Sequence, residues 1–322
     1  MASAFRPPPR AYFGHVRRAR IDPSRRGGDA RVTRRLLVLV NPAAAGGRAV
    51  RRLPEVTAEL ERLGVEHRVV HTRDTAHARA EATGAVKAGE VVAAVGGDGL
   101  LRPLAEVLRD TPSALAIVPG GRGNDLARVL GIPTDPTAAA GVAAGGRERL
   151  LDVAEVDGVP YLGIASFGFD SDANRLANEA RLVRGNLVYL YAALRALVAW
   201  KPAGFTVTVD GDRHELEGYS VAVANSKAYG GGMLLAPHAE LDDGILEVVA
   251  TGRSSKLHSL RCLPRVFKGT HLEDPSVSTL RGEVIEVDAS RPFAIYADGD
   301  PIGTVPATIT VRPRCLRVIV PG

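Results

Sequence analysis

Three glycine-bearing turns carry the chemistry that this sequence could perform. The segments "NPAAAGG" at 41–47, "GGDG" at 96–99 and "PGGRGND" at 119–125 each follow a short aliphatic run directly. Glycine lets backbone N–H groups approach phosphate oxygens closely, and a following helix adds the positive end of its dipole. One such turn by itself is usually no more than the connection between a strand and a helix. Three at matching positions predict a phosphate-binding site.

The turns do not follow the two common phosphate-loop patterns. None matches G-x-x-x-x-G-K-[ST], and G-x-G-x-x-G does not follow the first aliphatic run. In "GGDG" the Asp98 carboxylate would lie beside a phosphate, which is unfavourable unless a divalent cation or a substrate hydroxyl lies between them. A kinase without a P-loop needs such an arrangement.

The elements that position these turns alternate regularly in the first half of the chain. Four strands separated by helices predict a mainly parallel, doubly wound sheet with ligand sites at the carboxyl ends of its strands. Strands are expected at 36–40, 66–71, 91–95 and 114–118, and helices at 49–62, 75–87, 101–108, 124–130 and 137–146. After about residue 150, the stretches 150–156, 159–166 and 205–225 indicate strands joined by tight turns, marked by "DG" hairpin signals. The second half is therefore expected to be an antiparallel β domain, with helices at 186–200 and 256–267.

Composition and charge narrow the class of protein. The 322 residues are 45% hydrophobic, enough for two domains of an α/β enzyme. Residues 1–35 hold ten arginines and two aspartates, a local charge of +8, so the net charge of +5 leaves −3 for the remainder. A basic arm at 1–34 could bind anionic headgroups or nucleic acid. We prefer a solvated disordered leader, or a start site assigned too early, and expect no nucleic-acid partner.

Cysteine, histidine and serine spacing argues against several other classes. Cys262 and Cys315 show no CxxC or Cys/His spacing, which disfavours a zinc site or a disulfide framework and favours a reducing cytosol. The histidines at 71, 77, 214, 238, 258 and 271 are interpreted as ordinary surface or core residues. No G-x-S-x-G elbow supports a serine hydrolase. The sequence contains no run of about 18 apolar residues that could span a bilayer. We therefore expect a cytoplasmic protein that associates peripherally with the membrane surface.

The motifs in order resemble one enzyme family. "LVLVNPAAAGG", "VGGDGLLRPLAEVL", "AIVPGGRGNDLARVLGIP" and "IYADGD" resemble the signature of the diacylglycerol-kinase catalytic family, whose relatives include sphingosine, ceramide and bacterial lipid kinases. "FGFDSDANRLAN", "YGGGMLLAPHAELDDGILEVV" and "LPRVFKGTH" resemble its actinobacterial-type members. The resemblance implies a nucleotide-binding domain like that of NAD kinase at 35–150 and a β-sandwich lipid-substrate domain at 151–307. The final strand, 308–322, could pack back on the first domain.

The resemblance also implies a set of site residues. ATP would be contacted at Asn41, Thr72, Gly97, Asp98 and Gly121, and the same turns add Gly96, Gly99, Arg122 and Asn124. Asp298 falls where the family has the carboxylate that accepts the proton of the lipid hydroxyl. Asp243, with the main-chain carbonyls of Glu240 and Ile245, matches a structural Mg²⁺ site. Judged without context, Asp298-Gly299 is a hairpin turn and "AELDDG" an acidic surface turn, and both interpretations stay open.

The sequence departs from the family near the nucleotide. Leu100 replaces the usual threonine, Arg102 and Pro103 replace an Asn-Glu pair, and Arg122 replaces a second threonine. Arg122 could donate paired hydrogen bonds to phosphate or could face solvent. These changes put the geometry and preference of nucleotide binding in doubt.

We therefore expect an ATP- and Mg²⁺-dependent lipid kinase that makes phosphatidate from diacylglycerol, in transient contact with anionic membrane. Alternatives are a kinase for another lipid alcohol or for NAD, or a homologue that binds nucleotide or membrane without turnover. The helical stripe Leu187, Leu190, Tyr191, Leu194, Leu197 and Val198 could be core or could face lipid. The sequence does not fix the oligomeric state, and a homodimer is one possibility.

Overall fold

The computed structural model describes residues 34–169 and 202–322. The basic arm, most of "FGFDSDANRLAN" and the helix expected at 186–200 with its apolar stripe lie outside the described residues. The chain from 33 onward forms one compact unit.

The first part is a parallel sheet in the order β4-β3-β1-β2. Its strands are β1 (Leu36–Val40), β2 (His67–His71), β3 (Val91–Gly96) and β4 (Leu115–Pro119), and every neighbouring pair is parallel. β1 and β4 are buried along their full length, as expected for strands covered on both faces. The strand order reverses between β1 and β3, so the carboxyl ends of β1, β3 and β4 meet at one edge.

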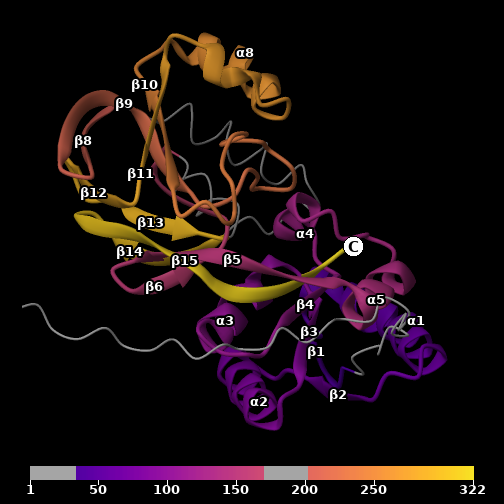
Figure 1. Ribbon diagram of the computed structural model, residues 1–322. Coiled ribbons are helices and arrows are strands. Elements are labelled where there is room, and N and C mark those ends of the chain that lie inside the picture. Colours follow the sequence, from indigo (N-terminus) through magenta and orange to yellow (C-terminus); the bar gives the residue numbers. More distant parts are fainter. Residues whose placement is uncertain (1–33, 170–201) are drawn as a thin grey trace, which may run out of the picture. The chain divides into compact units, whose positions relative to one another are not determined.

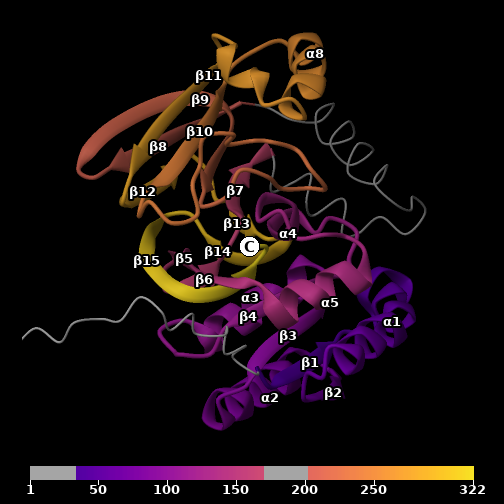
Figure 2. The ribbon, with the colours of Figure 1, turned by 45° about the vertical axis from the view of Figure 1, so that its right-hand side comes forward.

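Helices cover both faces of this sheet (Figures 1 and 2). They are the one-turn η1 (Ala44–Gly46), α1 (Arg48–Arg62), α2 (Thr75–Ala88), α3 (Asp98–Leu108), α4 (Asp125–Val129) and α5 (Pro136–Gly145). α1 packs against α5, and α2 packs against α3. Local signals fix the ends of two helices, because Asp74 and Asp135 accept hydrogen bonds from the backbone N–H groups of His77 and Ala138.

The second part is antiparallel. Its strands are β5 (Arg147–Val156), β6 (Val159–Tyr161), β7 (Ile164–Gly168), β8 (Ala203–Val209), β9 (Asp212–Ala224), β10 (Leu246–Gly252), β11 (Val277–Gly282), β12 (Val284–Ala289), β13 (Ala294–Ala297), β14 (Asp300–Thr304) and β15 (Ala307–Val320). It also contains α8 (Lys256–Val266) and η2 (Thr270–Glu273). The "DG" signals are confirmed as hairpins: Asp210 and Gly211 adopt φ of 50° and 95° between β8 and β9.

One expected strand is broken. The run 159–166 divides into β6 and β7, with Leu162 and Gly163 outside both. The backbone N–H groups of these two residues leave the sheet ladder and donate to the Asp298 side chain instead. The break is therefore part of the candidate site.

β15 connects the two parts. It pairs antiparallel with β12 and β5 and, near its end, parallel with β4. One buried apolar cluster lies among the parallel strands and their helices, and a second lies within the antiparallel part around Phe167, Phe205 and Ile285. The predicted fold class, a parallel α/β core with a C-terminal antiparallel β-sandwich, is confirmed.

Candidate functional site

The second and third glycine turns touch one another. They follow the adjacent strands β3 and β4, and the backbone N–H of Gly120 donates to the carbonyl of Gly96 at 2.6 Å. A Cβ atom at Gly121 would overlap the Cα of Gly97, and one at Gly97 would lie 3.0 Å from the Cα of Gly121. Only glycine permits this backbone contact.

Asn124 holds the third turn in shape. It adopts a left-handed φ of 53°, a conformation that Asn tolerates, and its Oδ1 accepts the Gly121 N–H at 2.9 Å. Its Nδ2 donates to the carbonyl of Gly121 at 3.2 Å. Asn124 therefore positions Gly121, and its predicted contact with nucleotide stays a prediction.

Asp98 and Asp125 place two carboxylates close together at the ends of β3 and β4. Their Oδ2 atoms each lie 3.0 Å from the position that a Cβ would take at Gly123, so they are at most 6.0 Å apart. Asp125 Oδ2 accepts the N–H of Gly231 at 2.9 Å. Among the described residues, the buried Oδ1 atoms of Asp98 and Asp125 have no hydrogen-bond partner. An oxygen left in this state needs a cation or a donor that is not among the described residues.

Burial raises the pKa of both carboxyls. For Asp98 the backbone N–H groups of residues 124–126 oppose this effect, and for Asp125 the N–H of Gly231 opposes it. The negative charge of Asp98 raises the pKa of Asp125 further. Two acids that disfavour each other's ionisation in a buried place are typical of a cation site.

Asp298 forms the turn of the β13–β14 hairpin and is also a site residue. Asp298 and Gly299 adopt φ of 53° and 91°, so the hairpin interpretation is confirmed. The carboxylate accepts the N–H groups of Leu162 at 2.8 Å and Gly163 at 2.9 Å. Burial, assisted by the charge of Asp98, raises the pKa of Asp298 to about 6. A carboxylate with this pKa suits proton transfer near neutral pH.

The three carboxylates line one cavity of about 100 Å³. Its wall comes from both parts of the fold, because α3, the turn between β4 and α4, α4 itself, the β6–β7 break, the 228–231 loop and the β13–β14 turn all contribute. The lining residues include Asp98, Gly123, Asp125, Leu162, Gly163, Tyr229, Gly231, Tyr296 and Asp298. The sequence motifs had indicated Asp98 and Asp298 but had missed Asp125, although it ends the quoted "PGGRGND" turn.

Arg102, one of the departures from the family, reaches this region. From α3 its Nη2 lies 3.1 Å from Asp300 Oδ2, on the strand that follows the Asp298 turn. Its positive charge opposes the rise in the pKa of Asp298. The ion pair joins α3 to the β13–β14 hairpin that carries Asp298, a contact that sequence reasoning did not predict.

The remaining predicted nucleotide residues lie at the same edge of the sheet but play different parts. Thr72 is buried, and its hydroxyl donates to the Val40 carbonyl at 3.2 Å. Asn41 Oδ1 accepts the Ala43 N–H at 3.0 Å and shapes the first turn. Gly99 and Arg122 are exposed. A basic side chain that the prediction lacked, Arg48, donates to the carbonyl of Gly121 at 3.2 Å.

The two other departures are part of the core. Leu100 is 5% exposed and Pro103 is buried within α3. Leu100 packs against Gly96, where an added Cβ would come within 3.3 Å of its Cδ2. Neither side chain can therefore stand in for the polar group that the family has at its position.

The predicted structural Mg²⁺ residues lie in the loop before β10. Asp243 Oδ2 is 2.9 Å from Arg281 Nη2, and its Oδ1 accepts the N–H of Ile245 at 3.0 Å. Glu240 pairs with Lys227 at 2.8 Å. Because the Asp243 carboxylate, the one side-chain ligand predicted, is already balanced by Arg281, this arrangement does not fit an ion without the departure of Arg281. The magnesium site here stays a prediction.

None of the described helices is long and apolar enough to cross a membrane.

Comparison with known proteins matches the two parts to two family models. Residues 35–156 match the diacylglycerol kinase catalytic domain, and residues 163–320 match the YegS C-terminal NAD kinase beta sandwich-like domain. The gap between them contains Leu162, a donor to Asp298. A solved structure of a putative diacylglycerol kinase from Bacillus anthracis str. Sterne covers 92% of this chain and 97% of its own, with a TM-score of 0.78 at 20% identity. That likeness concerns the fold.

Relatives in sequence agree. The diacylglycerol kinase of Mycobacterium tuberculosis is 34% identical over 295 residues, 89% of this chain and 95% of the relative. A probable YegS-like lipid kinase of Pseudomonas aeruginosa is 30% identical over 292 residues, 89% and 95% of the two chains. The chain therefore belongs to the diacylglycerol kinase and YegS-like family of lipid kinases.

Proposed function

We propose that this chain uses ATP and Mg²⁺ to phosphorylate the free hydroxyl of diacylglycerol, giving phosphatidate and ADP. The observation that carries the proposal is the meeting of Asp98, Asp125 and Asp298 around one cavity, beside two glycine turns that touch. The relatives named diacylglycerol kinase support the choice of acceptor.

Asp298 has the geometry of a general base. Its two oxygens are held by backbone N–H groups from the β6–β7 break, so the side chain cannot turn away from the cavity. The hydroxyl proton of the acceptor passes to Asp298 while the hydroxyl oxygen attacks the γ-phosphorus, and the bond from that phosphorus to the ADP oxygen breaks.

Asp98 and Asp125 fit a magnesium ion, because each has a buried Oδ1 without a partner among the described residues. Asp98 and Asp125 would hold the ion, and its charge would offset that of the ATP phosphates. The glycine turns would receive the phosphates, since Gly97 and Gly121 present backbone rather than side chains. Arg48, beside Gly121, would add positive charge.

We further propose that the outer face of α8 contacts anionic membrane. Leu257, Leu260 and Phe267 are 59%, 38% and 52% exposed and repeat at helical spacing along α8 and its end. Residues 248–272 contain five lysines and arginines and no acid. An exposed apolar stripe flanked by cations is the pattern of a helix that lies in a membrane interface.

The test is transfer of labelled γ-phosphate from ATP with Mg²⁺ to dioleoylglycerol, sphingosine, ceramide and NAD, with the lipids in mixed vesicles. Labelled phosphatidate as the main product is expected. Labelling of a different acceptor would refute diacylglycerol as substrate and keep the kinase chemistry. A protein that binds ATP but labels nothing would refute the enzyme and favour a binding homologue.

A further inference from the structure

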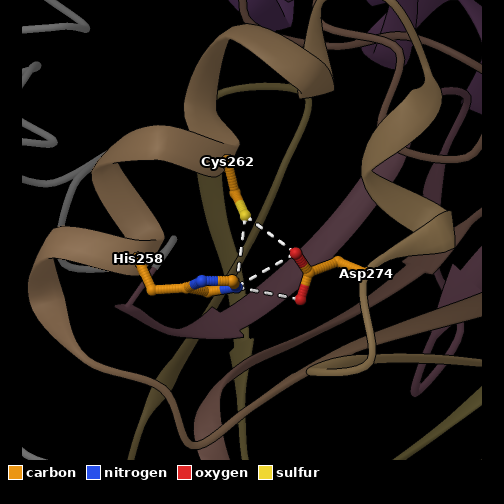
Figure 3. Close-up of side chains that lie close together, drawn as sticks. All are labelled: His258, Cys262 and Asp274. Carbon is orange, nitrogen blue, oxygen red and sulfur yellow. Dashed lines mark hydrogen bonds and ion pairs between the residues drawn. The ribbon is translucent and has the colours of Figure 1, made fainter.

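His258, Cys262 and Asp274 form a cluster away from the catalytic cavity (Figure 3). His258 and Cys262 lie one turn apart on α8, so both side chains project from the same face of the helix. Asp274 follows η2 directly. None of the three lines the cavity around Asp298.

We propose that these three side chains bind a zinc ion, with a fourth position open to water. The donor set is one imidazole nitrogen, one sulfur and one carboxylate oxygen, all of which zinc accepts. Three protein ligands and one open position are a common zinc arrangement. This inference does not rest on the kinase activity.

The distances among the three donors suit this geometry. In a tetrahedral site with Zn–S of about 2.3 Å and Zn–N and Zn–O of about 2.0–2.2 Å, the sulfur lies about 3.5 Å from each other donor, and nitrogen and oxygen lie about 3.3 Å apart. Cys262 Sγ is 3.5 Å from His258 Nε2 and 3.1 Å from Asp274 Oδ2. His258 Nε2 is 3.0 Å from Asp274 Oδ2. The donors must therefore separate by only a few tenths of an ångström.

Neighbouring groups hold the ligands in place. Ser276 donates to Asp274 Oδ1 from both its backbone N–H, at 3.1 Å, and its hydroxyl, at 2.8 Å. Ser255 caps α8 by accepting the N–H of His258 at 3.2 Å. The Asp274 side chain is 4% exposed while that of His258 is 44% exposed, which leaves an entry path on the imidazole side.

Arg265 competes with the ion for Asp274. Its Nη1 lies 3.2 Å from Asp274 Oδ2, and its Nη2 donates to the carbonyl of Thr270 at 2.7 Å. Without metal this guanidinium balances the buried carboxylate. Zinc would replace that contact and would fix α8 to η2 on the face of α8 opposite to Leu257 and Phe267.

The experiment uses the full chain, freed of metal with a chelator and titrated with zinc against a chromogenic competitor. Cys262→Ser is the ligand variant and Cys315→Ser the matched control, because Cys315 is the second cysteine and lies in β15. We expect one equivalent of zinc for the unchanged chain and for the control. Ser276→Ala should weaken the affinity for zinc about 10–100-fold, because the Ser276 hydroxyl holds the ligand Asp274 in place. Cys262→Ser should weaken it by more than that, because it removes a ligand.

Two further measurements separate a metal site from a simple hydrogen-bond network. Cobalt in place of zinc should give a thiolate-to-cobalt charge-transfer band that Cys262→Ser lacks and Cys315→Ser keeps. Zinc should raise the melting temperature of the unchanged chain but not of Cys262→Ser, whose circular dichroism should match that of the unchanged chain. No zinc uptake by the unchanged chain, or equal uptake by Cys262→Ser, would overturn the proposal.

Discussion

Replacing Asp298 by Asn tests both the chemistry and the electrostatics of the site. Asn keeps the size of the side chain and removes its charge. Because the amide has a single acceptor oxygen, one of the two N–H groups from Leu162 and Gly163 loses its partner, at a cost of about 1–3 kcal/mol that does not depend on pH. The pH-dependent part of the change therefore reports the carboxyl group alone.

The magnitude follows from the raised pKa of Asp298. Its value of about 6 in the folded chain, against 3.8 for an ordinary Asp, is a shift of about two units, or about 3 kcal/mol. Because the folded pKa is the higher one, the folded chain binds this proton more tightly than the unfolded chain. The stabilisation is full below pH 3.8 and is lost as the pH rises through 6. About half of the loss, roughly 1.4 kcal/mol, falls between pH 5 and pH 8.

The assay is urea unfolding of the unchanged chain and of Asp298→Asn at matched pH values. The free energy of unfolding of the variant, minus that of the unchanged chain, should rise by about 1.4 kcal/mol from pH 5 to pH 8. Asp210→Asn is the control, because Asp210 also forms an Asp-Gly hairpin turn and accepts backbone N–H groups, from Glu283 and Val284, at an exposed position.

Activity gives a second readout of the same change. Asp298→Asn should lower kcat about 10²–10⁴-fold, the usual worth of a general base, while Asp210→Asn should not. In the unchanged chain kcat/KM should rise with pH through about 6, as Asp298 ionises. A stability difference that does not vary with pH would refute the raised pKa of the buried Asp298 carboxyl. An Asp298→Asn enzyme with unchanged activity would refute Asp298 as the general base.

Three other variants test the glycine turns, the ion site and the α8 face. Gly121→Ala should lower the free energy of unfolding by about 1–3 kcal/mol in urea, because its Cβ would overlap the Cα of Gly97. Gly84→Ala in α2 is the control: an added Cβ meets nothing within 4 Å there, so it should raise the free energy of unfolding by up to about 1 kcal/mol, and equal effects of the two changes would contradict the contact between the turns. Asp125→Asn should raise the Mg²⁺ concentration needed for half-maximal activity, and an unchanged magnesium dependence would remove Asp125 from the proposed ion site. Replacing Leu257 and Phe267 together by Ser should weaken binding to anionic vesicles at least 10-fold in a sedimentation assay, since each side chain contributes about 1.5–3 kcal/mol when fully buried. Val50→Ser is the control, because Val50 is an exposed apolar residue on α1, and it should leave vesicle binding unchanged. Vesicle binding equal to that of the unchanged chain would exclude the α8 face.

The parallel part of the fold was predictable because its signals are local. Aliphatic runs and helical periods alternate at short range, and the expected strand at 36–40 agrees with β1 to the residue. The same holds for the Asp-Gly hairpins, whose left-handed conformations depend on two adjacent residues. The break between β6 and β7 was missed because the run 159–166 is mainly apolar and was interpreted as one strand, and only the distant Asp298 explains why two N–H groups leave the ladder.

Long-range contacts explain the misses in the site. Asp125 belongs to a quoted motif, yet its role follows from a bond to Gly231, over a hundred residues away. The sequence was interpreted as having no Cys/His metal spacing, and the cluster of His258 and Cys262 with Asp274 is visible only in the structure because Asp274 comes from another element. Asn124, quoted in the same motif, holds the turn through its bond to Gly121, and its predicted contact with nucleotide stays a prediction.

By itself, then, the sequence determined the order of the elements and the glycine turns at the strand ends, with Asp98 in one of them, because backbone conformation and hydrophobic period are properties of neighbouring residues. Asp298 was indicated only by the resemblance of "IYADGD" to a family motif. Tertiary structure alone decided which side chains share a cavity, which carboxylates are already paired and how far burial shifts their pKa. Those properties depend on distance and dielectric environment between residues far apart in the chain, and no local pattern encodes them.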